Sequence, residues 1–199
     1  MRIVIPDDFP TVYSQRPDLQ ALLREQGALE IFDTRASGEE ELAARLEGAA
    51  VAVNVRAYCA FPRSLVERLP ALRLISIVGT GTDHIDLDAC TEQGVVVVNT
   101  PGASTASVAE LTLALMLAAA RRVPFTDAKV RAGVWYHEEG IELEGKTLGL
   151  VGLGLIGQAV ARMAHGLGMR VLAWSFHPDP VRATETAVEM VSLDELLRE

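Results

Sequence analysis

The groups with the clearest chemistry are three glycines, Gly152, Gly154 and Gly157, spaced as GxGxxG. An apolar β-type run at 147–151 precedes them, and an amphipathic helical pattern at 158–167 follows. Strand, glycine turn and helix in this order form the fingerprint of a dinucleotide-binding site. The first glycine permits a tight turn, the second lets a pyrophosphate approach the backbone, and the third lets the helix pack against the strand. The helix N-terminus then offers N–H groups to the phosphates, although a glycine-rich turn in an ordinary βα unit is the alternative.

The histidines and cysteines of the chain are weaker candidates for chemistry. We interpret His84, within GTDHID, as structural. His137 lies beside two glutamates in a segment that we expect to be a solvated loop, and His165 belongs to the fingerprint helix, where it packs or faces solvent. Cys59 and Cys90 have apolar neighbours and no metal-ligand spacing, so we expect reduced core residues and no metal site.

Composition sets the class of protein. At 199 residues with 49% hydrophobic side chains, the chain can form one large or two small globular domains. The formal net charge of −9 argues against nucleic acid and anionic membranes as partners. The longest apolar stretch, 111–120, is far shorter than the roughly 20 residues that span a bilayer, and MRIVIPDD does not resemble a signal peptide. We therefore expect a cytoplasmic protein.

Strand and helix patterns alternate through the first half of the chain. The expected strands lie at 2–5, 29–32, 50–55, 72–78 and 95–98. The expected helices lie at 18–26, 39–46, 62–69 and 86–93. Strands separated by helices predict an α/β fold with a parallel, doubly wound sheet, which we assign to a first domain at 1–98.

The pattern changes at 99–102, where proline and glycine mark a turn or hinge. Ser107 and Glu110 form a capping-box pattern that predicts a helix at 108–122, and Pro124 is expected to end it. A short helix to about 131 and an irregular charged arm at 133–145 come next. The fingerprint unit is followed by strands at 169–174 and 188–190 and by a helix at 192–198. This is only the first half of a Rossmann domain, so the fingerprint strand, normally central, should have an unpaired edge.

Four motifs in this order resemble the D-isomer-specific 2-hydroxyacid dehydrogenases. They are SIVGTGTDHIDLDACTEQGVVVVNTPG, STASVAELTLALMLAAARRV, RAGVW and LEGKTLGLVGLGLIG. The resemblance implies a flavodoxin-like substrate domain at 1–98 and an incomplete NAD(P)-binding Rossmann domain at 99–199. It also implies hydride transfer between NAD(P)H and a small 2-keto or 2-hydroxy acid. Glyoxylate, hydroxypyruvate, phosphoglycerate and lactate remain open as substrates, and of NAD and NADP we favour NAD.

The resemblance also assigns residues to the substrate and to the nicotinamide. The loop that would present backbone N–H groups to the substrate carboxylate consists of Val78, Gly79, Thr80 and Gly81. Two glycines after a strand agree with this role, since they let backbone donors converge on an anion, and a plain βα turn is the alternative. Thr105 and Val108 would lie near the nicotinamide, although helix capping and core packing explain them equally well.

At the other end of the cofactor, the resemblance assigns Leu155, Ile156 and the three fingerprint glycines to the pyrophosphate. Leu155 occupies a position where relatives often carry a polar or basic side chain. Ser175 stands where an acidic residue should hold the adenosine ribose, about 20 residues after the glycines. A serine does not repel a 2′-phosphate, so NADP is not excluded, and His177 or Arg182 could help to hold it.

The family's catalytic His, Glu and Arg lie in the second half of the cofactor domain, and this chain ends before them. We therefore expect no catalytic residue in the chain, an inactive 199-residue piece and a longer parent enzyme. A non-catalytic, NAD(H)-sensing dimer or interaction protein of corepressor type is the alternative. The resemblance further implies a homodimer through the helix at 108–122 and the arm at 133–145.

Overall fold

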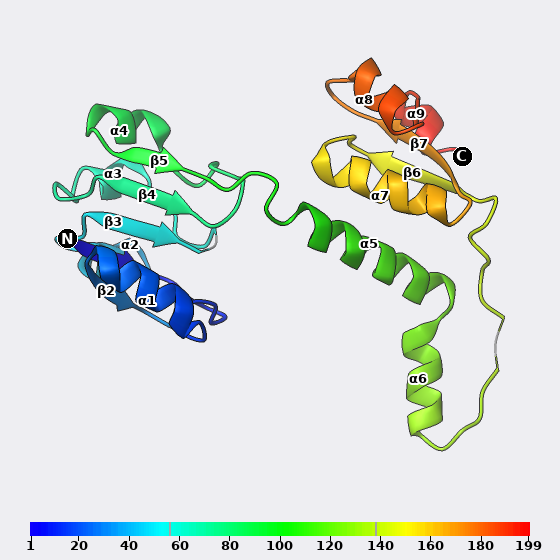
Figure 1. Cartoon of the computed structure of the whole chain (residues 1–199), viewed down its shortest axis with the longest axis horizontal. Helices are drawn as coiled ribbons and strands as arrows, with labels where there is room; N and C mark the ends of the chain where they lie inside the picture. Colours follow the sequence, from blue (N-terminus) through cyan, green and yellow to red (C-terminus); the bar gives the residue numbers. More distant parts are fainter. Residues whose placement is uncertain (56, 138) are drawn as a thin grey trace. The chain divides into compact units, whose positions relative to one another are not determined.

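The computed structural model describes residues 1–55, 57–137 and 139–199 (Figure 1). It divides into two compact units, Met1–Ala103 and Ser104–Glu199. Each unit has its own sheet and its own hydrophobic core, and each is described by itself.

The first unit contains a five-stranded parallel sheet. Its strands are β1 (Arg2–Ile5), β2 (Ala28–Ile31), β3 (Val51–Asn54), β4 (Leu74–Ile77) and β5 (Val96–Val98). They lie in the order β2-β1-β3-β4-β5, and every neighbouring pair is parallel. This is the flavodoxin-like order, in which the strand sequence reverses between β1 and β3. The predicted α/β class and parallel sheet are confirmed.

The helices of this unit cover both faces of the sheet. They are α1 (Pro17–Gln26), α2 (Glu39–Leu46), α3 (Arg63–Val66) and α4 (Leu87–Glu92). Strand residues alternate between two clusters, so Val4 packs with side chains of α2, α3 and α4, whereas Ile3 and Ile5 pack with Leu23 of α1. The alternation follows from the two-residue period of a strand and makes the sheet doubly wound.

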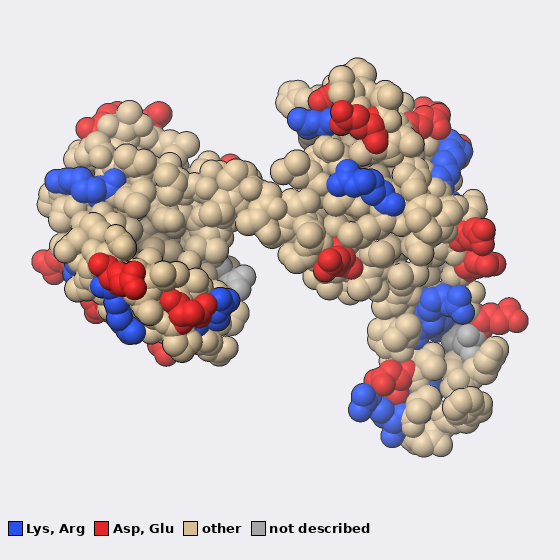
Figure 2. All heavy atoms as spheres, viewed as in Figure 1, with Lys and Arg blue, Asp and Glu red and all other residues tan. Residues whose placement is uncertain are grey.

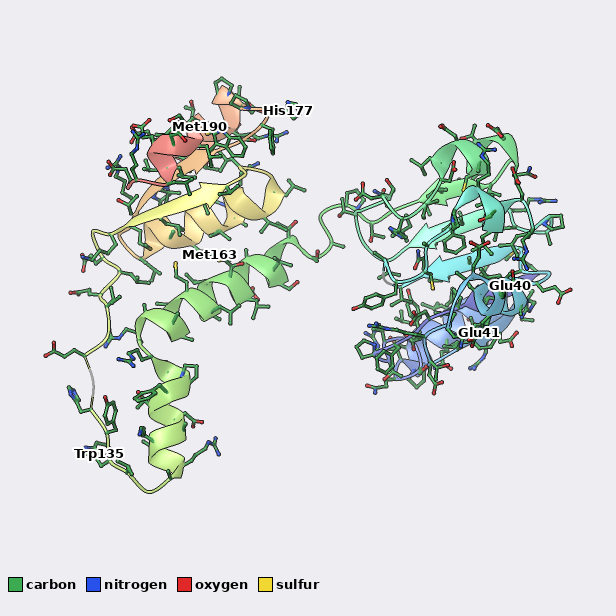
Figure 3. All side chains as sticks on the ribbon, turned by 180° about the vertical axis from the view of Figure 1, so that it is seen from behind. Glu40, Glu41, Trp135, Met163, His177 and Met190 are labelled. Carbon is green, nitrogen blue, oxygen red and sulfur yellow. The ribbon has the colours of Figure 1, made fainter. Side chains whose placement is uncertain are left out.

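The second unit is built on a three-stranded parallel sheet in the order β6-β7-β8. Its elements are α5 (Thr105–Ala120), α6 (Val123–Arg131), β6 (Thr147–Val151), α7 (Leu155–Gly166), β7 (Arg170–Trp174), α8 (Pro180–Glu185), β8 (Glu189–Met190) and α9 (Leu193–Leu196). Helix α5 packs along α7, with Ala109, Ala159 and Val160 buried between them and Met163 against the same cluster (Figure 3). Within the described residues, β6 pairs only with β7, as expected for a fingerprint strand with one free edge.

The long helix α5 differs from its prediction at both ends. It begins at Thr105 instead of 108, so Ser107 lies inside the first turn and donates to the Ser104 carbonyl at 3.0 Å. The capping-box interpretation was therefore wrong. The helix ends before Pro124, because Arg122 adopts a left-handed conformation with φ 53°. Pro124 instead lies in the first turn of α6, where its missing N–H is tolerated.

Helix α8 was not predicted at all. Its N-cap, Asp179, accepts hydrogen bonds from Val181 N and Arg182 N at 3.0 and 3.3 Å, and Pro180 follows it directly. An aspartate N-cap followed by proline is a common start of a helix, so the pair Asp179 and Pro180 was a signal in the sequence that the prediction missed. Helix α7 also begins three residues earlier than predicted, at Leu155, which places its N-terminus within the glycine turn.

Charged side chains of both signs are interspersed over the face of each unit that Figure 2 displays. In the part of the chain that the structure describes, no helix has both the length and the apolar character needed to cross a bilayer.

Candidate functional site

The glycine turn between β6 and α7 uses each glycine differently. Gly152 has φ 104°, a conformation that favours glycine, and its N–H donates to the Trp174 carbonyl at 2.7 Å. At Gly157, a Cβ would lie 2.3 Å from the Gly152 carbonyl oxygen, so only glycine lets α7 approach the strand this closely. At Gly154, a Cβ would meet nothing within 4 Å, so the turn is open to a ligand on that side.

The N-terminus of α7 is free to bind an anion. Its N-cap is Gly154, which has no side chain to satisfy the first amides, and the first bond into the helix runs from Gln158 N to the Gly154 carbonyl. The N–H groups of Leu155, Ile156 and Gly157 meet no acceptor among the described residues. Unsatisfied amides at the positive end of a twelve-residue helix favour a phosphate.

The end of β7 lies beside this turn. Trp174 pairs in register with Val151, so Ser175 follows at the same sheet edge as Gly152. The Ser175 hydroxyl contacts the His177 carbonyl only at 3.4 Å, which leaves it available to a ribose hydroxyl. His177 is exposed (Figure 3). Arg182 does not stand free, because its Nε lies 3.0 Å from the Asp179 carboxylate.

The loop after β4 contains the four residues predicted to bind a carboxylate, and two of their amides are already used. Val78 N donates to the Asn54 carbonyl at 2.9 Å, and Gly79 N donates to the Thr100 hydroxyl at 2.9 Å. The N–H groups of Thr80 and Gly81 meet no acceptor among the residues that the structure describes. Any anion at this loop would therefore be held by these last two amides.

A hollow of about 320 Å³ lies against this loop. Val78, Gly79, Gly81, Asp83 and His84 are among its lining residues. Burial lowers the pKa of His84, although the Asp83 carboxylate acts in the opposite direction. His84 thus lines the same hollow as Gly81, one of the two residues with a free amide.

Sequence reasoning missed the partner of His84, which is Asn54 at the end of β3. The Asn54 side chain is 1% exposed, and its Nδ2 lies 3.1 Å from the Cys59 carbonyl and 2.9 Å from His84 Nε2. Its Oδ1 is buried without a hydrogen-bond partner among the described residues. The signal available in the sequence was Asn54 itself, an amide side chain in an otherwise apolar strand.

The family follows from comparison with known proteins. The family model described as "D-isomer specific 2-hydroxyacid dehydrogenase, catalytic domain" matches residues 11–194. The chain belongs to this family. The resemblance stated from the four motifs is confirmed.

Individual relatives support the same family assignment. A D-3-phosphoglycerate dehydrogenase of Methanocaldococcus jannaschii is 42% identical over 178 residues, which cover 87% of this chain and 33% of that protein. The crystal structure of the TT0316 protein from Thermus thermophilus matches with a TM-score of 0.85 and 37% identity over the whole chain and 62% of that structure. D-lactate dehydrogenase from Aquifex aeolicus, complexed with NAD and lactic acid, gives a TM-score of 0.81 at 29% identity over the whole chain and 58% of that structure. The chain thus spans less than two thirds of each of these proteins.

Thr105 and Val108, which we predicted to lie near the nicotinamide, are both in the first turns of α5. Thr105 is half-buried and Val108 is 37% exposed. Ala109, next along the helix, is buried against α7. The role of the two residues stays a prediction.

A second feature missed from the sequence is a buried arginine that supports the strand ends of the first unit. Arg45, in α2, is 7% exposed, and its guanidinium donates to the Pro6 carbonyl at 2.7 Å and also bonds the Thr34 carbonyl and the Glu41 carboxylate. Bonds from Ser37 and Arg45 lower the pKa of Glu41 to about 2. The i,i+4 spacing of Glu41 and Arg45 is equally typical of an exposed surface pair, so the sequence alone does not show that Arg45 is buried.

Asp8, which follows β1, is also buried and fully bonded. It is 0% exposed and accepts hydrogen bonds from the backbone of Val12, Tyr13 and Ser14 at 2.9, 2.9 and 2.7 Å. Burial opposes ionisation, but these bonds outweigh it and lower the pKa of Asp8. The cysteines agree with their predicted core positions, since both are free and buried, and burial raises the pKa of the Cys59 thiol to about 12.

Proposed function

We propose that the chain is the cofactor-binding and carboxylate-binding part of an NAD(P)-dependent dehydrogenase of small 2-hydroxy acids. The observation that carries the proposal is the turn at Gly154, which is open on its ligand side and continues into the free N-terminus of α7. The Aquifex aeolicus relative, whose structure holds NAD and lactic acid, supports the same pairing of ligands for this chain.

The residues present fit a dinucleotide. At Gly154 the space into which a Cβ would project is open and forms the proposed pyrophosphate cradle, and the amides of Leu155, Ile156 and Gly157 would hold the pyrophosphate. The Ser175 hydroxyl would bind the adenosine ribose. The bound nicotinamide supplies the hydride. The chain's own contribution is binding and orientation, because the amides of Thr80 and Gly81 would fix the carboxylate of the 2-keto acid.

We further propose that NAD is preferred to NADP. Ser175 tolerates either cofactor, but Arg182, the arginine that could pair with a 2′-phosphate, already pairs with Asp179. An additional phosphate would have to compete with that carboxylate. In this proposal residues 1–98 form the substrate domain and residues 99–199 the cofactor domain.

We also propose that the chain forms a homodimer through α5 and the arm at 133–145. Leu111 and Leu115 of α5 are 58% and 61% exposed, and Trp135 of the arm is 91% exposed (Figure 3). Leu111 and Leu115 lie one helical turn apart, so together they expose an apolar face of α5 that supports association.

The test of the function is a calorimetric titration of the 199-residue chain with NADH and NADPH. We expect NADH to bind more tightly than NADPH. We expect Gly154→Ala to weaken both, because its new methyl group occupies the pyrophosphate cradle, while the free energy of unfolding stays within ~0.5 kcal/mol. Gly38→Ala is the matched control, since a Cβ there also meets nothing within 4 Å but lies in the first unit. A folded chain that binds neither nucleotide would contradict the proposal.

A further inference from the structure

The starting point is the orientation of the Asn54 amide. Its Nδ2 lies 3.1 Å from the Cys59 carbonyl oxygen. A carbonyl oxygen can only accept, so it must face the NH₂ end of the amide and not the oxygen end. The Cys59 carbonyl therefore decides which end of the Asn54 amide faces it. Oδ1 then points away and remains without a partner among the described residues.

This orientation determines where the proton of His84 lies. The same Nδ2 lies 2.9 Å from His84 Nε2, so the second N–H of the amide faces that ring nitrogen. Nε2 must accept, which leaves the single proton of the neutral ring on Nδ1. A protonated ring would bring an N–H of His84 against an N–H of Asn54. Burial lowers the pKa of His84 and therefore also favours the neutral ring.

The N–H of Nδ1 meets no acceptor in the described part of the chain, and His84 lines the 320 Å³ hollow beside the carboxylate loop. The free amides of Thr80 and Gly81 belong to that loop. The Asp83 carboxylate lines the hollow too, and it disfavours a second negative group there. The hollow therefore suits a neutral oxygen acceptor close to a bound carboxylate.

We propose that His84 is a specificity residue whose Nδ1–H, fixed by Asn54, donates a hydrogen bond to a neutral oxygen on the C3 substituent of the 2-keto acid. The inference rests on the proposed function, since it needs the carboxylate at Thr80 and Gly81. Asn54 is a positioning residue, because it acts only through His84. A 2-keto acid with a C3 hydroxyl is favoured over one with a methyl group.

The first test is the tautomer of His84 in the whole 199-residue chain. Long-range ¹H–¹⁵N correlation spectra distinguish Nδ1–H from Nε2–H rings, and we expect the Nδ1–H form for His84. In Asn54→Leu the donor to Nε2 is gone, so we expect a mixture of tautomers. A wild-type ring protonated on Nε2 overturns the inference, whether or not Asn54→Leu folds.

The second test is the preference for hydroxypyruvate over pyruvate, measured by calorimetry with NADH present. One neutral hydrogen bond should make hydroxypyruvate bind about two- to tenfold more tightly. His84→Phe should abolish this preference, so that the two acids bind equally well, and His84→Gln, which keeps an N–H donor, should restore part of it. His137→Phe, which removes an exposed histidine of the other unit, should retain the full preference.

The outcomes separate the two proposals. A preference that persists in His84→Phe overturns the role of His84 alone. A chain that binds NADH but neither acid overturns both the donor role and the proposed substrate class. A chain that does not bind NADH contradicts the proposed function, and the tautomer then still decides the arrangement of Asn54 and His84.

Discussion

Replacing Gly157 with alanine should destabilise the second unit by a predictable amount. The new Cβ would lie 2.3 Å from the Gly152 carbonyl oxygen, whereas real Cβ contacts essentially never fall below 3.0 Å. Helix α7 would have to move by about 0.7 Å, the difference between these distances. Its residues Ala161 and Ala164 are 0% exposed, so there is little room for that shift. Overpacking of this kind typically costs ~1–3 kcal/mol, and we expect a loss of about 2 kcal/mol in the free energy of unfolding.

The assay is urea denaturation followed by tryptophan fluorescence. Both tryptophans, Trp135 and Trp174, lie in the same unit as α7, so the signal reports on that unit. Gly166→Ala is the matched control in the same helix, because a Cβ there meets nothing within 4 Å. It should leave stability unchanged or raise it by up to ~1 kcal/mol. If the free energies of unfolding of Gly157→Ala and Gly166→Ala differ by less than about 0.5 kcal/mol, the close packing of strand and helix is not the reason for glycine at position 157.

Three further predictions concern other parts of the chain. Arg45→Met should lower the free energy of unfolding by ~2–4 kcal/mol in urea, because the buried Pro6 carbonyl loses its donor and Glu41 loses its buried cationic partner. The exposed pair lost in Arg68→Met should cost less than ~1 kcal/mol, and equal losses would contradict the burial argument. The pKa of Asp8 is lower in the folded protein than in the unfolded chain, where it is about 3.9. Ionised Asp8 therefore stabilises the fold fully above pH ~3.9, and this contribution is lost as the pH falls through the folded-state pKa. Asp8→Asn should reduce the difference in the free energy of unfolding between neutral and acid pH. Leu115→Glu should convert a dimer into a monomer in sedimentation experiments. The free energy of unfolding should not change, because this side chain is 61% exposed. A wild-type monomer would refute the proposed dimer.

Much of the fold could be predicted because it depends on local patterns. Apolar strands alternating with helices gave the parallel sheet of the first unit, and the helix at 39–46 has the predicted bounds. The glycine spacing located the turn before α7. The missed helix α8 and the wrong start of α5 both reflect short capping signals, which compete with similar residues nearby.

The rest could not be predicted because it depends on contacts between distant residues. Asn54 and His84 are 30 residues apart, and no local pattern shows that one fixes the tautomer of the other. The four residues predicted to bind the substrate carboxylate were assigned through family resemblance. That resemblance could not show that Gly79 N is already used by Thr100, which leaves only two free amides among the described residues of the loop.

The bonds between the carboxylate loop and the segment after β5 bear on how this domain could be exchanged between relatives. Thr100 accepts from Gly79 N at 2.9 Å and returns its own N–H to the Gly79 carbonyl at 2.8 Å, while Asn99 Nδ2 donates to the Thr80 carbonyl at 2.8 Å. A recombination point at the end of β5 would divide these partners between two parents. The sheet would be inherited whole, but the loop would lose the residues that shape it. A segment that transfers the first unit with this loop intact therefore has to extend at least through Thr100.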